Sequence, residues 1–186
     1  MKNILFFVFI LYSISMIGQT FEVTPDGLRD IDNTDKSYLV LSFPGKSANE
    51  LYKKSVRYMN EIQSDPDASS KSNLENEYLR FRTIIPSALN YKQGFIKIAI
   101  DLDYNTELKF KDGKVRIEFV GIKMPAKDYK YSLVFSAGKM DGYYIVYDNK
   151  GKLYKKEAKE DLERIFNTRV MNYLNYMSKE DNQDDW

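Results

Sequence analysis

The chain has 186 residues, a formal net charge of +1, and neither cysteine nor histidine. Without cysteine it can form no disulfide and has no thiol nucleophile, and without histidine it lacks the usual general base and the commonest metal ligand. Ser-His-Asp triads, His-based zinc sites and two-His-one-carboxylate iron sites are therefore excluded, and we expect no metal or other cofactor.

Residues 1–19 predict an export signal. Lys2 supplies a positive start, residues 4–14 are apolar, and small and polar residues lead to cleavage after Gly18 or Gln19. The apolar run is about eleven residues long, too short to span a bilayer, which needs about twenty. No cysteine follows the run. We therefore expect an exported protein of the periplasm or extracellular space, not a lipoprotein and not membrane-spanning after signal removal.

The charge balance argues against a nucleic-acid partner. Loss of Lys2 with the signal lowers the 28 basic residues of the chain to 27, equal to its 27 acidic residues. A protein that neutralises many phosphates is normally basic, so we expect no nucleic-acid binding.

The first elements after the signal are a polar segment and a strand. Residues 20–37 contain the turn signal Pro25-Asp26-Gly27 and predict a loosely held N-terminal lead-in. Residues 38–43 (YLVLSF) predict a strand that Pro44-Gly45 ends.

A helix over about 48–63 comes next. Ser47 and Glu50 have the spacing of a capping box, in which each side chain satisfies a free backbone N–H at the helix start. Glu50 and Lys54 are expected to pair on the outer face. The apolar residues behind the cap recur at helical spacing and predict one buried stripe: Ala48, Leu51, Tyr52, Ser55, Val56, Met59 and Ile62.

Strands with alternating side chains occupy the middle of the chain. After a polar loop at 64–73, we expect a strand from Tyr78 to Ile85, before Pro86, and another over 96–104. Residues 106–122 predict a β-hairpin in which Asp112-Gly113 forms a two-residue type I′ turn.

The last part of the chain predicts a strand over 131–135, a second hairpin and a long helix. The second hairpin pairs residues 143–147 with 152–156 across residues 149–151. An acidic tail over 179–186 closes the chain. The helix carries a buried stripe at helical spacing: Ala158, Leu162, Ile165, Phe166, Val170, Tyr173, Leu174 and Met177.

This order predicts one α+β domain over residues 38–178. Its architecture is a two-layer sandwich, a twisted antiparallel sheet with two helices on one face. The other face is then open to solvent or to a ligand. Its expected side chains are Lys97, Asp101, Asp103, Lys109, Arg116 and Glu118.

The arrangement resembles a known family. The segments that carry the resemblance are SANELYKKSVRYMNEI (47–62), ENEYLRFR (75–82) and YNTELKFKDGKVRIEFVGI (104–122). They are similar to exported domains of unknown function with a TATA-box-binding-protein-like (TBP-like) fold, found mostly in Bacteroidetes-type bacteria. The resemblance covers roughly residues 36–122 and implies the fold. It implies no activity and no functional residues, and DNA binding would follow only from fold-level analogy.

Two pairs of carboxylates are candidates for acid/base chemistry or cation binding. Asp101 and Asp103 share a strand face and could serve as an acid/base pair or hold calcium, although a solvated strand face explains them better. Asp65 and Asp67, with neighbouring serines, could bind a hard cation, but the spacing lacks the ligand series of an EF-hand loop.

Arginine and tyrosine supply the candidate binding residues. Arg80, Arg82 and Arg116 could converge on one sheet face and clamp an anion; pairing with Glu75, Glu77 and Glu118 explains them equally well. Tyrosine crowds the second predicted hairpin, where Tyr143, Tyr144 and Tyr147 form the best candidate surface, beside Tyr129, Tyr131 and Tyr154. Tyrosine suits interfaces and sugar contacts, and it also forms sheets well.

These features favour a non-enzymatic, exported binding module of the cell envelope whose partner is a protein, a peptide or a glycan. The first alternative is a carboxylate-dependent glycan hydrolase using Asp101 or Asp103, which needs two carboxyls across a cleft. The second is a structural, self-associating envelope protein. The sequence leaves the oligomeric state open.

Overall fold

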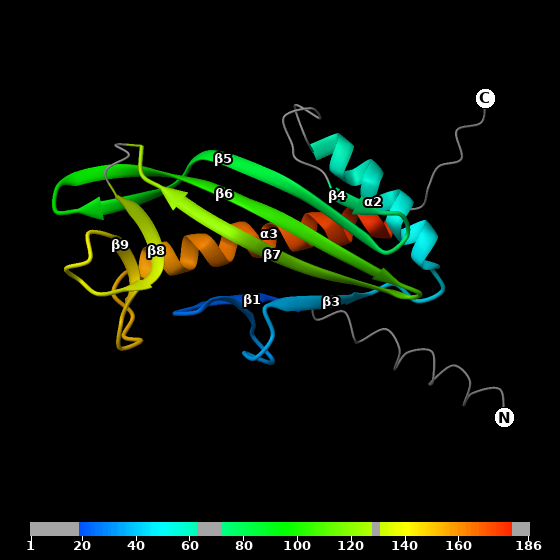
Figure 1. The fold of residues 1–186 in the computed structure, drawn as a ribbon, viewed down its shortest axis with the longest axis horizontal. Helices are drawn as coiled ribbons and strands as arrows, with labels where there is room; N and C mark the ends of the chain where they lie inside the picture. Colours follow the sequence, from blue (N-terminus) through cyan, green and yellow to red (C-terminus); the bar gives the residue numbers. More distant parts are fainter. Residues whose placement is uncertain (1–18, 63–71, 128–130, 180–186) are drawn as a thin grey trace, which may run out of the picture.

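The computed structural model describes residues 19–62, 72–127 and 131–179, so the predicted signal segment, except Gln19, and most of the acidic tail lie outside it. Among the described residues, seven strands form one sheet, and a separate hairpin pairs β1 with β2 (Figure 1). The elements in chain order are β1 (Phe21–Thr24), β2 (Gly27–Asp30), β3 (Tyr38–Ser42), α2 (Ala48–Ile62), β4 (Ser72–Leu74), β5 (Tyr78–Gln93), β6 (Ile96–Lys111), β7 (Lys114–Pro125), β8 (Ser132–Ala137), β9 (Tyr144–Asp148) and α3 (Lys156–Ser178).

The sheet is mixed and mostly antiparallel. Its strands follow the order β4-β5-β6-β7-β8-β9, and β3 pairs with the first part of β7. All these pairs are antiparallel except β8 with β9, which run parallel. The predicted α+β class is confirmed, and the parallel pair is the one departure from the expected antiparallel sheet.

Both helices cover the same face of the sheet, as predicted. Burial along β6 alternates with period two, so Tyr104 and Phe110 point to one side. The Tyr104 ring lies 5.2 Å from Phe166 of α3, and the Phe110 ring lies 5.6 Å from Tyr52 of α2. In Figure 1, α3 runs along the length of the sheet and α2 lies at one end. Neither of the two described helices lies on the opposite face of the sheet (Figure 1).

The start of α2 confirms the predicted capping box. The Ser47 backbone N–H donates to Glu50 Oε2 over 2.7 Å, and the Glu50 N–H donates to Ser47 Oγ over 3.3 Å. The expected outer-face position of Lys54 is wrong. Its side chain is buried, and its ammonium donates to the backbone carbonyl of Lys179 just beyond α3.

β5 continues past Pro86, where the sequence predicted its end. The pairing with β6 shifts register between Ile85 and Leu89, which places Pro86 in a β-bulge. Proline is tolerated there because the bulged residues leave the hydrogen-bond ladder. Ser87 has φ 53°, and its N–H donates to Asp101 Oδ1 over 2.7 Å, so the bulge is held by a side chain of the neighbouring strand.

The predicted hairpin around Asp112-Gly113 is present as β6–β7, but its turn is not type I′. Lys111 pairs with Lys114 across two residues, and Gly113 has φ 73°. A type I′ turn also needs a positive φ at Asp112, and among the described non-glycine residues only Asn76 and Ser87 have one. Asp112 instead uses its side chain, whose Oδ1 accepts the Ala48 N–H of α2 over 2.8 Å.

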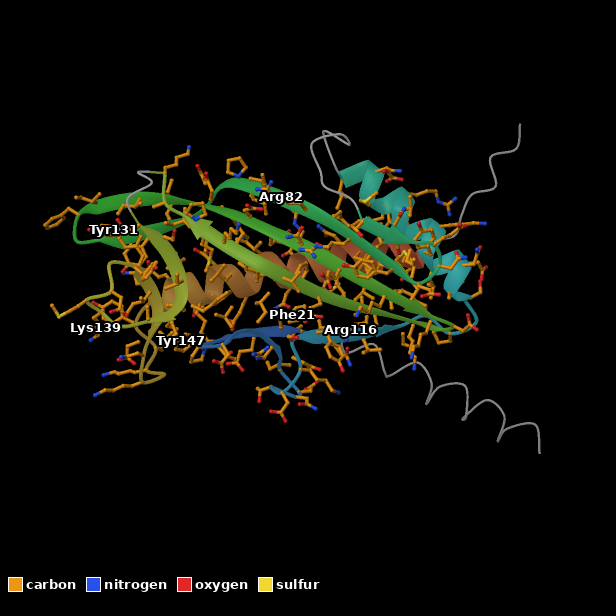
Figure 2. The ribbon with its side chains drawn as sticks, viewed as in Figure 1. Phe21, Arg82, Arg116, Tyr131, Lys139 and Tyr147 are labelled. Carbon is orange, nitrogen blue, oxygen red and sulfur yellow. The ribbon has the colours of Figure 1, made fainter. Side chains whose placement is uncertain are left out.

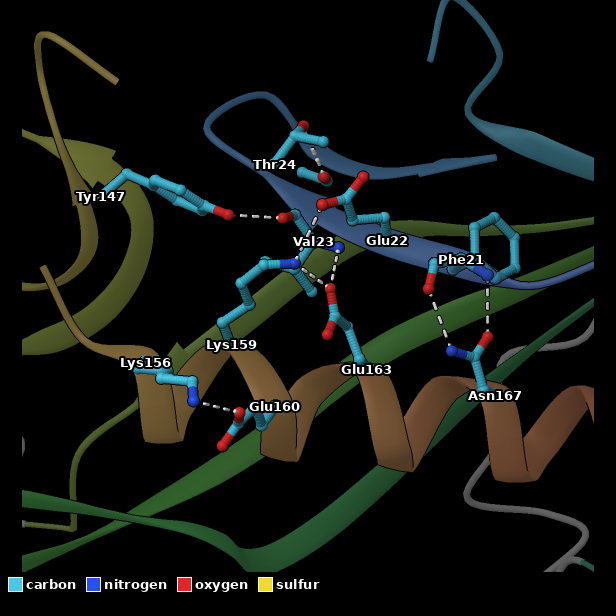
Figure 3. Close-up of polar contacts among 11 residues, drawn as sticks. Phe21, Glu22, Val23, Thr24, Tyr147, Lys156, Lys159, Glu160, Glu163 and Asn167 are labelled. Carbon is cyan, nitrogen blue, oxygen red and sulfur yellow. Dashed lines mark hydrogen bonds and ion pairs between the residues drawn. The ribbon is translucent and has the colours of Figure 1, made fainter. Parts of the chain in front are cut away.

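Residues 20–30 are packed against the domain, so the expected loose lead-in is wrong over this part, while residues 31–35 are exposed. Phe21 and Val23 of β1 are buried, and Figure 3 shows how α3 holds this strand. The Asn167 side chain accepts the Phe21 N–H over 2.8 Å and donates to the Phe21 carbonyl over 2.9 Å. Glu163 Oε1 accepts the Val23 N–H over 2.9 Å. Side chains of α3 therefore bond to backbone groups of β1 that a second neighbouring strand would otherwise engage.

The second predicted hairpin forms only in part, as an antiparallel return across residues 149–151 in which the Tyr154 N–H donates to the Val146 carbonyl over 2.8 Å. Residues 144–148 form β9, but they pair in parallel with β8, in a register that joins Leu133 to Tyr144 and Ala137 to Asp148. Residues 152–156 form no strand and contribute one isolated bridge, between Leu153 and Tyr147. Within the described ranges, no helix is both long enough and apolar enough to cross a membrane.

Candidate functional site

A pocket of about 280 Å³ lies at the end of the molecule where β5, β9 and the β8–β9 connection meet. Five tyrosines from separate parts of the chain line it together with a lysine and a methionine. We call this site the tyrosine pocket and define it by Tyr91, Tyr131, Lys139, Met140, Tyr143, Tyr144 and Tyr154. Figure 2 labels Tyr131 and Lys139 at this end of the molecule.

The parallel pairing of β8 and β9 creates one wall of the pocket. Parallel neighbours need a connection that returns to the start of the first strand. Here residues 138–143 make that return, and they supply Lys139, Met140 and Tyr143 to the lining. The strand direction that the sequence failed to predict is therefore what builds the site.

Local contacts shape this returning segment. Asp141 Oδ2 accepts the Gly138 N–H over 2.6 Å, and the Asp141 N–H donates back to the Gly138 carbonyl over 3.1 Å. Gly142 has φ 78°, and a Cβ at this position would lie 3.4 Å from the Tyr131 ring. The positive φ angle therefore favours glycine here, while a Cβ would only come into van der Waals contact with the ring.

Three of the tyrosine rings form the floor. Tyr91 of β5 stacks on Tyr144 of β9, with ring centroids 4.5 Å apart and an interplanar angle of 27°. Tyr131 meets Tyr144 edge to face, at 5.6 Å and 76°. Aromatic pairs with these geometries are favourable beyond their buried area. The floor is therefore built by contacts among side chains of the chain itself.

Two lysines lie over tyrosine faces at the edges of the site. Lys139 Nζ is 4.9 Å from the centre of the Tyr154 ring, and Lys155 Nζ is 5.2 Å from that of Tyr91. Burial raises the pKa of the Tyr91 hydroxyl above its ordinary value of 10.0, and the nearby Tyr154 hydroxyl adds to the rise. The Tyr91 phenol is therefore neutral at physiological pH and can both donate and accept a hydrogen bond.

The rim of the pocket is exposed and aromatic. Tyr143 is 49% exposed, Tyr154 is 52% exposed, and Met140 at the apex of the returning segment is 98% exposed. Exposed aromatic rings beside a concave surface offer ring faces, hydroxyl groups and a flexible thioether to a ligand. This combination suits stacking against a sugar ring or a peptide side chain.

The structure separates the three tyrosines that the sequence grouped. Tyr144 lies in the floor and Tyr143 in the rim of the tyrosine pocket. Tyr147 lies elsewhere: it is buried, and its hydroxyl donates to the Val23 carbonyl of β1 over 2.7 Å. Burial raises the pKa of Tyr147. Tyr129 lies outside the described residues.

The three candidate arginines share the open face, but each lies beside a carboxylate. Arg82 forms two hydrogen bonds with Asp103, of 2.8 and 2.7 Å. Arg80 lies 3.4 Å from Glu107. The alternative expectation, that the arginines pair with carboxylates, therefore holds for Arg80 and Arg82. Their partners are carboxylates of β6 and not the expected Glu75 and Glu77.

Arg116 is held differently from the other two. It pairs with Glu118 on its own strand, as the alternative expected, and its Cζ lies 3.7 Å above the centre of the Tyr38 ring. The three arginines are thus spread along the open face rather than gathered around one anion site.

Asp101 and Asp103 both have structural roles. Asp101 accepts the Ser87 N–H in the β5 bulge, and Asp103 holds Arg82. The hydrogen bond from Arg82 lowers the pKa of Asp103, whereas a general acid of a glycosidase needs a raised one. Asp65 and Asp67 lie outside the described residues. Among the residues described, no group of three or more acidic side chains is placed to hold a metal ion.

Sequence reasoning missed Tyr91, Lys139 and Met140. Tyr91 comes from β5 and reaches the site only because β5 extends through the Pro86 bulge. Lys139 and Met140 lie in the connection between two strands whose parallel pairing had no local signal. The crowding of tyrosine around residues 131–154 was the one signal that pointed to this end of the molecule.

Comparison with known proteins supports the fold. No family model matches the chain, and no curated protein matches it. Two crystal structures resemble it at low sequence identity. A DUF4468 family protein from Bacteroides ovatus has a TM-score of 0.54 and 14% identity, over 78% of this chain and 87% of that one. A TBP-like protein from Parabacteroides distasonis has a TM-score of 0.50 and 13% identity, over 76% of this chain and 91% of that one. The structural resemblance predicted from the sequence is confirmed, and the chain has a TBP-like α+β fold.

Proposed function

We propose that this chain is a non-catalytic binding module of the cell envelope, exported by its N-terminal segment, and that the tyrosine pocket holds its ligand. The observation that supports this function most is the preformed aromatic floor of Tyr91, Tyr131 and Tyr144 beneath the exposed rings of Tyr143 and Tyr154. Binding sites are typically concave, apolar and largely built before the ligand arrives.

The ligand class that fits the pocket best is a glycan. A sugar ring can stack its C–H face on the exposed tyrosine rings, while its hydroxyl groups bond to phenol oxygens. The two lysines at the edges add donors without closing the site. An aromatic side chain of a peptide could use the same rings, so peptides form the second group to test.

The test is a glycan array and an envelope-peptide array, probed with residues 19–186 and with Tyr143→Ala and Tyr154→Ala. Truncating an exposed ring that stacks on a ligand removes about 1–3 kcal/mol of binding, which corresponds to roughly 5- to 150-fold in affinity. We expect the same spots to be lost or weakened in both variants, and Tyr143→Phe to retain them.

The matched control is Tyr78→Ala, a half-buried tyrosine at the other end of β5. If Tyr78→Ala weakens binding as much as the pocket variants do, the ligand does not lie in the tyrosine pocket. Binding that none of these variants changes would contradict the proposal. Light scattering on the same samples tests the self-associating alternative.

A further inference from the structure

A second surface of different chemistry lies on the open face near the β6–β7 turn, away from the tyrosine pocket. It is a groove of about 310 Å³ between β3, β6 and β7. We call it the basic groove and define it by Tyr38, Val40, Lys109, Lys111, Lys114 and Arg116. Arg116, labelled in Figure 2, lies far from the labelled Lys139 of the tyrosine pocket.

Strand register concentrates the positive charge of this groove. Val40 pairs with Arg116, and Arg116 pairs with Lys109, so these three side chains form one row across the sheet. The next row on the same face contains Lys114 and Lys111. Four cations therefore occupy two adjacent rows that contain no carboxylate.

The adjacent row toward the middle of the sheet carries negative charge. It contains Glu118 of β7, paired with Tyr38 of β3 and with Glu107 of β6. Positive charge is thus confined to the turn end of this face.

The lysines of the groove carry uncompensated charge. Lys109, Lys111 and Lys114 are exposed, and none of them forms an ion pair with another described residue. Asp112, which lies between Lys111 and Lys114 in sequence, accepts the Ala48 N–H of α2 and forms no ion pair with either lysine. Arg116 meets Glu118 through Nη2, and its Nε is buried without a hydrogen-bond partner. The groove therefore attracts anionic groups.

A strand edge borders the groove. β3 pairs with β7 on one side, and no second strand pairs with it among the described residues. The Val40 N–H points to this open edge, where it donates to Oε1 of Gln19 over 2.7 Å. An amide carbonyl thus already occupies the place that the carbonyl of an added strand would take.

We propose that the basic groove binds an acidic peptide segment in extended conformation, which adds as a strand to the open edge of β3. The backbone of the peptide replaces Gln19 as the acceptor of the Val40 N–H. Side chains of a strand alternate between faces, so every second residue of the peptide lies on the groove side. Carboxylates at those positions pair with Lys114 and Arg116. The exposed Val40 side chain contacts the apolar atoms of the peptide side chains on the same face.

Strand addition makes a prediction that charge attraction alone does not. The test measures binding of a fluorescent peptide of alternating Glu and Thr to residues 19–186. Its matched probes are a peptide of alternating Lys and Thr, the acidic peptide with alternate backbone nitrogens methylated, and oligogalacturonate as a charged saccharide. We expect binding of the acidic peptide alone, weakened about tenfold or more by N-methylation.

Two kinds of variant locate the site. Lys111→Glu with Lys114→Glu reverses the groove charge and should weaken binding about tenfold or more, whereas Lys150→Glu with Lys152→Glu, exposed lysines away from the groove, should not. Val40→Pro removes the outward N–H and leaves the β7 side of the strand intact, since proline is tolerated on strand edges. It should weaken binding while circular dichroism stays unchanged.

Failure to bind the acidic peptide would overturn the proposal. Equal binding of the N-methylated peptide or of oligogalacturonate would overturn it as well, because the groove would then recognise charge without a strand. Tyr143→Ala should leave peptide binding unchanged, which separates this result from that of the tyrosine pocket.

Discussion

Asn167 connects the N-terminal hairpin to α3 through both hydrogen-bonding groups of its side-chain amide. They engage the N–H and the carbonyl of Phe21, a residue that is 2% exposed. Leaving buried backbone groups without partners costs about 1–3 kcal/mol. Asn167→Ala should lower the free energy of unfolding by about this amount, measured by urea denaturation.

The control for this prediction is Asn172→Ala, an exposed asparagine on the same helix. It should change stability by about 0.5 kcal/mol or less. Hydrogen exchange at the Phe21 amide should also accelerate in Asn167→Ala. Unchanged exchange at that amide would show that α3 does not hold β1 through this side chain.

Asp103 on the open face makes the stability of the fold depend on pH. The hydrogen bond from Arg82 lowers the pKa of the folded Asp103 below its ordinary value of 3.8. A carboxyl group with a lowered pKa stabilises the fold above its unfolded pKa, and this contribution is lost as the pH falls through the folded pKa. Asp103→Asn should therefore flatten the acid side of the stability curve, and reduce stability at neutral pH.

Urea denaturation between neutral pH and pH values below that ordinary pKa measures this effect. Asp26→Asn, an exposed aspartate in the β1–β2 turn, controls for the loss of one negative charge. The free energy of unfolding is compared as a function of pH for both variants and the unmodified chain. If its slope on the acid side is the same in all three, the Arg82–Asp103 pair does not contribute to the stability of the fold.

At the level of elements, α2 begins at a junction of two distant chain segments. The capping box uses Ser47 and Glu50, while Asp112 in the β6–β7 turn accepts the Ala48 N–H. Removing a helix-capping acceptor costs about 0.5–2 kcal/mol. Asp112→Ala should lower stability by about 1 kcal/mol, and Asp112→Asn should lose less because its amide oxygen can still accept.

Hydrogen exchange at Ala48 measures this contact directly. The amide should exchange faster in Asp112→Ala and remain protected in Asp112→Asn. Equal exchange in both variants would show that the cap from the β6–β7 turn is not formed.

Elements with strong local patterns were predictable from the sequence. The stripe from Leu51 to Met59 and the period-two burial of β6 follow directly from side-chain spacing, and both occur in the structure. The position of the turn at Asp112-Gly113 was predicted correctly, but its type was not. Asp112 accepts the Ala48 N–H of α2 and does not adopt the positive φ that a type I′ turn needs.

Elements that depend on tertiary contacts were not predictable. β5 passes Pro86 because Asp101 of the neighbouring strand holds the bulge. The β1–β2 hairpin is ordered by Asn167, which is 146 residues away from Phe21 in sequence. The parallel direction of β9 has no local signal, so the tyrosine pocket that depends on it could be placed only approximately, through the crowding of tyrosine.

For the whole molecule, the sheet separates two surfaces with different chemistry. The tyrosine pocket, with exposed rings and a preformed floor, lies where β5, β9 and residues 138–143 meet. The basic groove lies beside β3 at the β6–β7 turn. Between them, Arg80 and Arg82 lie next to carboxylates of β6, which leaves this part of the open face without a concentrated charge. Each surface can therefore be changed without altering the other.

The claim that the tyrosine pocket is the ligand site is tested most directly by mapping a bound ligand onto the molecule. The strongest ligand from the glycan and peptide arrays is titrated into labelled residues 19–186, and amide chemical shifts are recorded by NMR. We predict that the largest shifts fall on residues 138–145, on Tyr91 and on Tyr154, and that Tyr143→Ala reduces them at the same ligand concentration. Shifts confined to the open face or to the basic groove would contradict the account.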